Sequence, residues 1–149
     1  MASLEEVFAK VIAFSAQASR AGVEFLNINQ EEKKILFKRG SVVGQILVRE
    51  WNEGIILVLI HIPIVWKPKR IDGNTLLKIL QMNSNILYGA IGFDQKANMI
   101  DFSYALLGNT LDAEEMLMAL VLMSKYADDI DEELCQLTGG ERGIDYLSK

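Results

Sequence analysis

The chain has 149 residues, half of them apolar, and a formal net charge of −5. This length corresponds to one ordinary domain, 1–149, and it suffices for a substantial core without disulfides or metals. The acidic balance argues against nucleic acid or an anionic membrane surface as a partner, because both attract cations. The single cysteine, Cys135, excludes an intramolecular disulfide.

The compartment expected from the sequence is the cytoplasm. The first residues, Met1–Glu6, lack the positive start and the apolar run of a signal peptide. The longest apolar stretch, Ile55–Trp66, is interrupted by His61 and Pro63. It is shorter than the roughly 18 residues that a membrane-spanning helix requires. We therefore expect no membrane association.

The first predicted element is an amphipathic helix. Ser3 and Glu6 have the spacing of a capping box, and Gly22 is a plausible end because it tolerates a left-handed conformation. The apolar positions recur with helical spacing at Leu4, Val7, Phe8, Val11 and Ile12.

A strand-rich region follows this helix. A short connection, Asn52–Gly54, indicates a hairpin. The almost wholly apolar run Ile55–Ile62 predicts a central strand covered on both faces, with Pro63 near its end or at a sheet edge. The expected strands are Val23–Ile28, Lys34–Arg39, Val42–Trp51 and Ile55–Val65, of which the first is the least clear.

The second half begins with a short helix, Thr75–Asn83, for which Asn74 is a reasonable N-cap. A second hairpin is expected from Ile86–Phe93 and Met99–Leu107. The hairpins imply an antiparallel sheet rather than a parallel, doubly wound one.

The last helix is expected to begin near Asp112, in capping-box spacing with Glu115, and to run to about Leu137. Acids near the C-terminus of a helix are unfavourable because of the helix dipole. The acids that follow Asp128 therefore leave open an alternative in which the helix ends earlier, near Asp129. The tail 141–149 is polar and is a candidate for mobility. The fold class is therefore α+β, an antiparallel sheet with helices packed on it. Three or four strands are expected before the second helix, and with three of them the order is α-β-β-β-α-β-β-α.

This order, in a small acidic chain, resembles the type III secretion chaperones of the Tir-chaperone-like group and the related YbjN-like proteins. The residues that carry the resemblance lie between Leu76 and Asp129: a leucine-rich helix ending in Asn83-Ser84-Asn85, the segment Leu87–Asp94, a strand ending in Tyr104–Leu107, and a long helix opened by Leu111–Glu115. The resemblance implies helices packed on an antiparallel sheet, commonly a homodimer, and apolar patches that hold an extended client segment. It implies a regulatory role in the YbjN-like proteins and no catalytic residue in either group.

Candidate catalytic residues are few, and we expect no enzyme and no cofactor. His61 is the only histidine, and it lies between Ile60 and Ile62 on a predicted strand. A strand-borne histidine of this kind is more often a hydrogen-bonded structural residue than a general base or a metal ligand. An enzyme that uses His61 with an acid such as Asp94 or Asp101 remains the alternative.

Two charged clusters have structural explanations that are more common than functional ones. The acids between Asp128 and Glu133 lack the pattern of a calcium loop, and a solvated helix face is expected, with no metal site. Trp66 stands beside Lys67, Lys69 and Arg70, and we expect a charged loop whose tryptophan packs back onto the core.

The strongest functional signal is an excess of apolar residues on two helices. Met116–Met123 is apolar through two helical turns, and Thr75–Asn83 is interrupted only by Lys78 and Gln81 among its central residues. A helix that is apolar all round must be covered on several sides. The predicted dimer or partner interface comprises Leu76, Leu77, Ile79, Leu80, Met82, Met116, Met118, Leu122 and Met123.

Several occupants could cover this surface. The helices could pack on each other over the sheet. The chain could instead be a non-enzymatic protein-binding module, either chaperone-like or a regulatory adaptor. A second copy of the chain would then cover the surface in a homodimer, with the Thr75–Asn83 helix at the dimer interface, or a client or regulatory protein would cover it. A structural subunit of a larger assembly is the third possibility.

Overall fold

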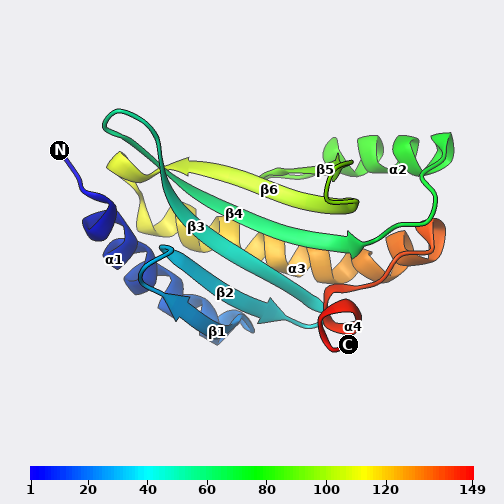
Figure 1. The fold of residues 1–149 in the computed structure, drawn as a ribbon, viewed down its shortest axis with the longest axis horizontal. Helices are drawn as coiled ribbons and strands as arrows, with labels where there is room; N and C mark the ends of the chain where they lie inside the picture. The colour runs from blue at the N-terminus through cyan, green and yellow to red at the C-terminus, as the bar shows by residue number, and fades with distance from the viewer.

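The computed structural model describes all residues 1–149 and shows a twisted six-stranded antiparallel sheet with two helices behind it (Figure 1). The strands are β1 Glu24–Asn29, β2 Lys34–Arg39, β3 Val42–Asn52, β4 Ile55–Trp66, β5 Ala90–Asp94 and β6 Met99–Leu107. The helices are α1 Leu4–Ser15, α2 Gly73–Asn83, α3 Ala113–Thr138 and α4 Gly143–Leu147, with short 3-10 helices η1 Ala16–Ala21 and η2 Gly108–Thr110. No helix combines the length and the apolar composition needed to cross a membrane.

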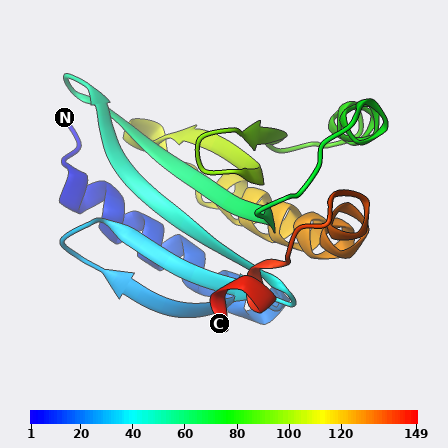
Figure 2. The same ribbon diagram turned by 45° about the vertical axis from the view of Figure 1, so that its right-hand side comes forward.

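The strand order is β1-β2-β3-β4-β6-β5, and each neighbouring pair is antiparallel. The α+β class is confirmed, and the first half contributes four strands, because the unclear segment does form β1. Helices α1 and α3 lie side by side on one face, whereas α2 lies beside β5 and the C-terminal half of α3 (Figures 1 and 2). The opposite face of the sheet carries no long helix (Figure 1).

The buried core lies between the sheet and these two helices and forms one continuous cluster. Val58, Ile60 and Ile62 of β4 are fully buried against it, and α3 contributes Met116 and Leu120, which are also fully buried. A helix at the centre of this layer is covered by the sheet and flanked by α1, which explains why α3 is apolar on several sides.

The expectation that β4 is covered on both faces is wrong. Its burial alternates from Ile55 to Ile62, so one face is buried and the other, which carries Leu57 and Leu59, is only half-buried. Pro63 lies three residues before the end of this strand, near the end as expected from the sequence. It is tolerated because β4 is irregular between Pro63 and Val65, and because the pairing with β3 has ended at His61.

Two boundaries differ from the sequence-based expectation, and the end of the last helix is decided between its two alternatives. Asp72, not Asn74, is the N-cap of α2, and its carboxylate accepts from the Thr75 N–H at 2.9 Å. Strand β5 begins at Ala90, because Gly89 has φ +77° and leaves the extended region. Helix α3 continues to Thr138, so its expected end at about Leu137 is confirmed and the alternative end near Asp129 is wrong.

Several local signals are confirmed. Ser3 and Glu6 form both hydrogen bonds of a capping box, and Gly22 ends the first helical segment in the left-handed region after η1. At α3, Asp112 accepts from the Glu115 N–H at 2.8 Å, and Gly139 closes the helix with φ +72°. The polar tail 141–149 carries structure of its own, because it contains α4 and packs on the end of β4.

Candidate protein-binding surfaces

The exposed face of α2 is made of leucines. Leu76, Leu77 and Leu80 are 48%, 55% and 64% exposed, while Thr75 and Ile79 on the opposite side are buried. The helix is anchored to the body through its buried side and through an ion pair between Lys78 and Glu133 of α3. Three leucines, here named the α2 leucine face, are thereby held towards solvent on a fixed helix.

The remaining residues of the predicted interface divide into two groups. Ile79, Met116 and Met123 are buried in the chain's own core, so they are not available to a partner. Met118 is 48% exposed, whereas Met82 and Leu122 are half-buried. For the methionine stretch, packing of the helices over the sheet accounts for most of the apolar excess.

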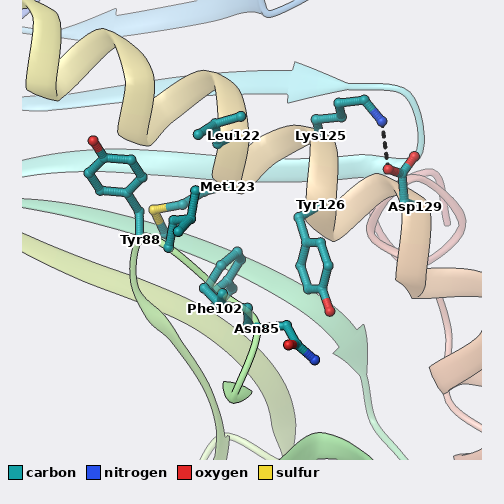
Figure 3. Close-up of a pocket in the computed structure, with 10 residues that line it drawn as sticks. Asn85, Tyr88, Phe102, Leu122, Met123, Lys125, Tyr126 and Asp129 are labelled. Atoms are coloured by element: carbon teal, nitrogen blue, oxygen red, sulfur yellow. Dashed lines mark hydrogen bonds and ion pairs between the residues drawn. The ribbon is translucent and has the colours of Figure 1, made fainter. Parts of the chain in front are cut away.

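A groove of about 230 Å³ separates α3 from the segment that joins α2 to β5 (Figure 3). Its walls are largely apolar and aromatic, and Lys125 and Asp129 form an ion pair of 2.7 Å at its α3 side. Phe102 and Tyr126 pack edge to face at its base, with ring centroids 6.1 Å apart. The residues that line this α2–α3 groove are Asn85, Ile86, Leu87, Tyr88, Phe102, Leu122, Met123, Lys125, Tyr126 and Asp129.

Leu87 at the groove is 84% exposed and was missed in the sequence prediction. It lies within a segment expected to be a strand, where alternate residues would be covered. The available signal was Gly89, two residues later, since a glycine inside a strand pattern often marks a bend. The groove and the α2 leucine face therefore lie next to each other, and both expose apolar groups.

The uncovered face of the sheet is a second apolar surface. One row across it runs Leu36–Gln45–His61–Ser103–Ala90, and the next row pairs Leu47 with Leu59 and Leu59 with Ala105. The leucines in these rows are half-buried in the isolated chain. We name this surface the open sheet face; its polar residues concentrate around His61.

His61 lies in a shallow groove on the open sheet face, flanked by Leu47, Leu59 and Ala105. The Gln45 amide donates to its Nδ1 at 3.3 Å, and its Nε2 donates to the Asp101 carboxylate at 2.9 Å. Both ring nitrogens are therefore engaged by structural partners, and none is directed at a nucleophile. A general base needs a free nitrogen within reach of the proton that it abstracts, so this arrangement favours a structural histidine.

Asp94, the other acid considered with His61, accepts from the Ala97 N–H at 2.9 Å in the β5–β6 turn. Cys135 is half-buried, and burial raises the pKa of its thiol to about 12, which makes it a poor nucleophile. Of the candidate catalytic residues, only His61 and Asp101 are brought together.

The acidic cluster on α3 is not a uniformly solvated face. Asp128 accepts from the backbone N–H and the hydroxyl of Ser41, both at 2.8 Å, and buried Asp131 also contacts this hydroxyl. The pair fixes the β2–β3 turn to α3. No group of three or more His, Cys, Asp or Glu side chains is arranged to hold a metal ion.

The basic loop after β4 caps α3. The N–H groups of Lys69 and Arg70 donate to the Thr138 carbonyl oxygen at 2.9 and 3.1 Å. Trp66 stacks on Tyr146 of α4, with ring centroids 4.5 Å apart and an interplanar angle of 11°. As expected from the sequence, Trp66 packs back onto the body of the protein.

Comparison with solved structures identifies the fold. A chain of the ExsC–ExsE complex superposes with a TM-score of 0.60 at 18% identity, over 85% of this chain and 95% of that chain. A chain of the HopA1–SchA chaperone–effector complex superposes with a TM-score of 0.55 at 12% identity, over 89% of this chain and 99% of that chain. No family model and no curated protein sequence matches the chain.

At these identities the likeness concerns the fold. It extends over nearly the whole length of both similar chains, so the helices and the sheet are shared as one unit. The fold-level resemblance to the secretion chaperones is confirmed: this chain has the fold seen in the ExsC–ExsE complex and in the HopA1–SchA chaperone–effector complex.

Proposed function

We propose that this protein is a non-enzymatic, chaperone-like protein-binding module that acts as a homodimer joined through α2. One observation carries the proposal: the α2 leucine face directs three leucines to solvent from a helix that is anchored on its other side. A soluble chain gains free energy by covering such a surface, at about 2 kcal/mol for each leucine that passes from exposed to buried.

The free energy gained by burying the leucines indicates how much surface the dimer needs. Each leucine of the α2 leucine face is about half exposed, so six of them in a symmetric dimer supply on the order of 6 kcal/mol. Association costs at least about 4 kcal/mol before any side chain is ordered. The leucines alone therefore support only a weak dimer, and Leu87 with the α2–α3 groove is the adjoining surface that would strengthen it.

The client role is supported by the open sheet face and by the fold. Both similar chains come from complexes between two proteins, one of them a chaperone–effector complex. The open sheet face leaves Leu36, Leu47 and Leu59 half-buried on strands that are otherwise well packed. An apolar segment of a client would complete their burial.

The mass of the native chain in solution tests the dimer. Light scattering at micromolar concentration should give about twice the chain mass of 16.7 kDa, and Leu80→Glu should return the mass of one chain. Gln81→Glu, which places the same charge on the neighbouring exposed position, is the control and should remain dimeric. A native chain that is strictly monomeric at these concentrations contradicts the proposal.

Co-purification from native cells separates a chaperone from a structural subunit. Exchangeable partners in varying amounts favour a chaperone or adaptor, whereas a partner of fixed stoichiometry favours a subunit of a larger assembly.

A further inference from the structure

The C-terminal segment Glu141–Lys149, here named the tail, fills a gap in the sheet. Beyond His61, strand β4 has lost β3 as a neighbour, and its last residue pairs with β6 on the other side. On the vacant side the Trp66 N–H donates to the Glu141 carbonyl oxygen at 2.8 Å, and the Glu141 N–H donates back to Trp66 at 2.9 Å. Glu141 therefore stands where a residue of β3 would otherwise pair.

The tail continues from this pair towards the β2–β3 turn. The Ile144 N–H donates to the Ser41 carbonyl oxygen at 2.9 Å, and Tyr146 stacks on the Trp66 indole. Gly143 permits the close approach, because a Cβ there would lie 3.1 Å from the Val43 nitrogen. The tail thus engages the body by backbone pairing and one aromatic ring.

The fit of the tail is incomplete. The Trp66 Nε1–H is buried and has no hydrogen-bond acceptor. A buried N–H without a partner is unfavourable, and a segment that placed a carbonyl or carboxylate oxygen there would remove the defect. The two ion pairs of the tail, Arg142–Asp145 and Lys149–Glu141, are both internal to it and do not bind it to the body.

We propose that the end of β4 around Trp66 is a docking site for a short segment of a partner protein, and that the tail occupies this site in cis until the partner displaces it. The tail specifies the partner's chemistry: one residue that pairs with the Trp66 backbone, a small residue two positions later, and an aromatic residue five positions later. Such a segment gains affinity from the same backbone pairing that now holds Glu141, and a helical turn like α4 places its aromatic residue on Trp66. This inference rests on the proposed protein-binding function, and it does not involve α2 or the dimer.

Binding of the tail's own sequence in trans tests the site in the full chain. Trp51 is 71% exposed, so its replacement by phenylalanine should not disturb the fold. Trp51→Phe leaves Trp66 as the only tryptophan, which then serves as the fluorescent reporter. The probe is a synthetic peptide of residues 139–149. In this background, the Tyr146→Ala chain should bind the peptide at least about tenfold more tightly than the parent chain with its unmodified tail does. The reason is that the variant has lost the ring stack of its own tail, which competes with the peptide. Leu147→Ala, at the next exposed position, is the matched control and should behave like the parent chain.

A peptide with alanine in place of its tyrosine should lose most of this affinity. Equal affinity of the parent and the Tyr146→Ala chain for the native peptide, or no saturable change in Trp66 emission with either, overturns the proposal. A dimer that forms normally in that case would leave the function proposed for α2 intact.

Hydrogen exchange on the unmodified chain provides a second measurement. The amides of Trp66, Glu141 and Ile144 should exchange through a local opening, well before the amide of Ile60 in the core. If these amides exchange only with global unfolding, the tail is a fixed part of the fold and the docking proposal is wrong.

Discussion

The side-chain amide of Asn83 forms two hydrogen bonds with the backbone of Ile91: its nitrogen donates to the Ile91 carbonyl oxygen at 3.0 Å, and its oxygen accepts from the Ile91 N–H at 2.8 Å. Asn83 is the last residue of α2, and Ile91 lies on the edge strand β5. The amide satisfies the groups that a further strand would satisfy. It therefore closes the edge of β5 at this point and fixes α2, with its leucines, to the sheet.

Removal of this contact should loosen α2. Asn83→Ala leaves the N–H and the carbonyl of buried Ile91 without partners, and we expect the free energy of unfolding to fall by about 1–3 kcal/mol. Urea unfolding measures the loss, and faster exchange of the Ile91 amide should accompany it. Asn85→Ala, which removes only an exposed and longer bond of 3.4 Å to Gln81, is the control and should have little effect.

The sequence predicted the elements whose signals are local. The boundaries of β2, β6 and the C-terminal end of α3 follow from apolar runs and from Gly139, because these residues act on their own segment. Acids such as Asp129 did not end α3, since the dipole effect is smaller than the free energy gained by burying Ile130 and Leu134.

Features that depend on distant residues could not be predicted. No local pattern shows that Met123 faces the core while Leu80 faces solvent, because the difference depends on which element lies opposite each helix. The docking of Tyr146 on Trp66 joins residues 80 positions apart, and the composition of the tail gives no sign of it. The α2 leucines were predicted as interface residues from composition, and only their exposure in the structure separates them from the buried Ile79.

The shared Ser41 hydroxyl predicts an unusual pH dependence. This hydroxyl has one proton but contacts carboxylate oxygens of both Asp128 and Asp131, so the two carboxylates compete for one donor, and a proton on Asp131 relieves this competition. Burial raises the pKa of Asp131 above its ordinary value of 3.8, although the Ser41 hydrogen bond acts in the opposite direction. The folded chain therefore holds this proton more tightly than the unfolded chain does. The contribution to stability is complete below the ordinary pKa and is lost as the pH rises through the folded-state pKa.

Asp131→Asn should remove this dependence, because the amide also donates a hydrogen bond but does not ionise. The variant should gain stability relative to the native chain as the pH rises above about 4, with a slope of up to about 1.4 kcal/mol per pH unit until the native Asp131 is ionised. Urea unfolding over a pH series measures the difference. Asp129→Asn, on the exposed side of α3, is the matched variant that removes one carboxylate from the same helix. A difference between Asp131→Asn and the native chain that stays constant with pH would show that Asp131 has no raised pKa.

The thiol of Cys135 should be nearly inert in the folded chain. Burial, followed by the charge of Asp131, raises its pKa from 9.0 to about 12. The thiolate fraction at pH 8 is thereby reduced by about a thousandfold, and alkylation by iodoacetamide should slow by a similar factor relative to the chain in urea. The rate for the folded chain should still be rising above pH 10. A thiol that reacts equally fast in the folded and unfolded chains would contradict the raised pKa.

Gly40 in the β2–β3 turn should tolerate no side chain without a loss of stability. It has φ +54°, where a side chain is strained by about 1–2 kcal/mol, and an added Cβ would overlap both carboxylate oxygens of Asp128. Gly40→Ala would force Asp128 away from the Ser41 N–H that it now accepts from, so we expect a loss of at least about 2 kcal/mol in the free energy of unfolding. The matched control is Gly73→Ala in the first turn of α2, where no atom lies within 4 Å of the added Cβ. That variant should be neutral or up to about 1 kcal/mol more stable.

A double-mutant cycle separates the overlap with the Asp128 carboxylate from the backbone strain that any side chain would cause at this position. In an Asp128→Ala background the overlap is absent, so Gly40→Ala should lose only the conformational part, about 1–2 kcal/mol. If Gly40→Ala costs the same with and without Asp128, the carboxylate is free to move aside, and the turn is not held to α3 through Asp128.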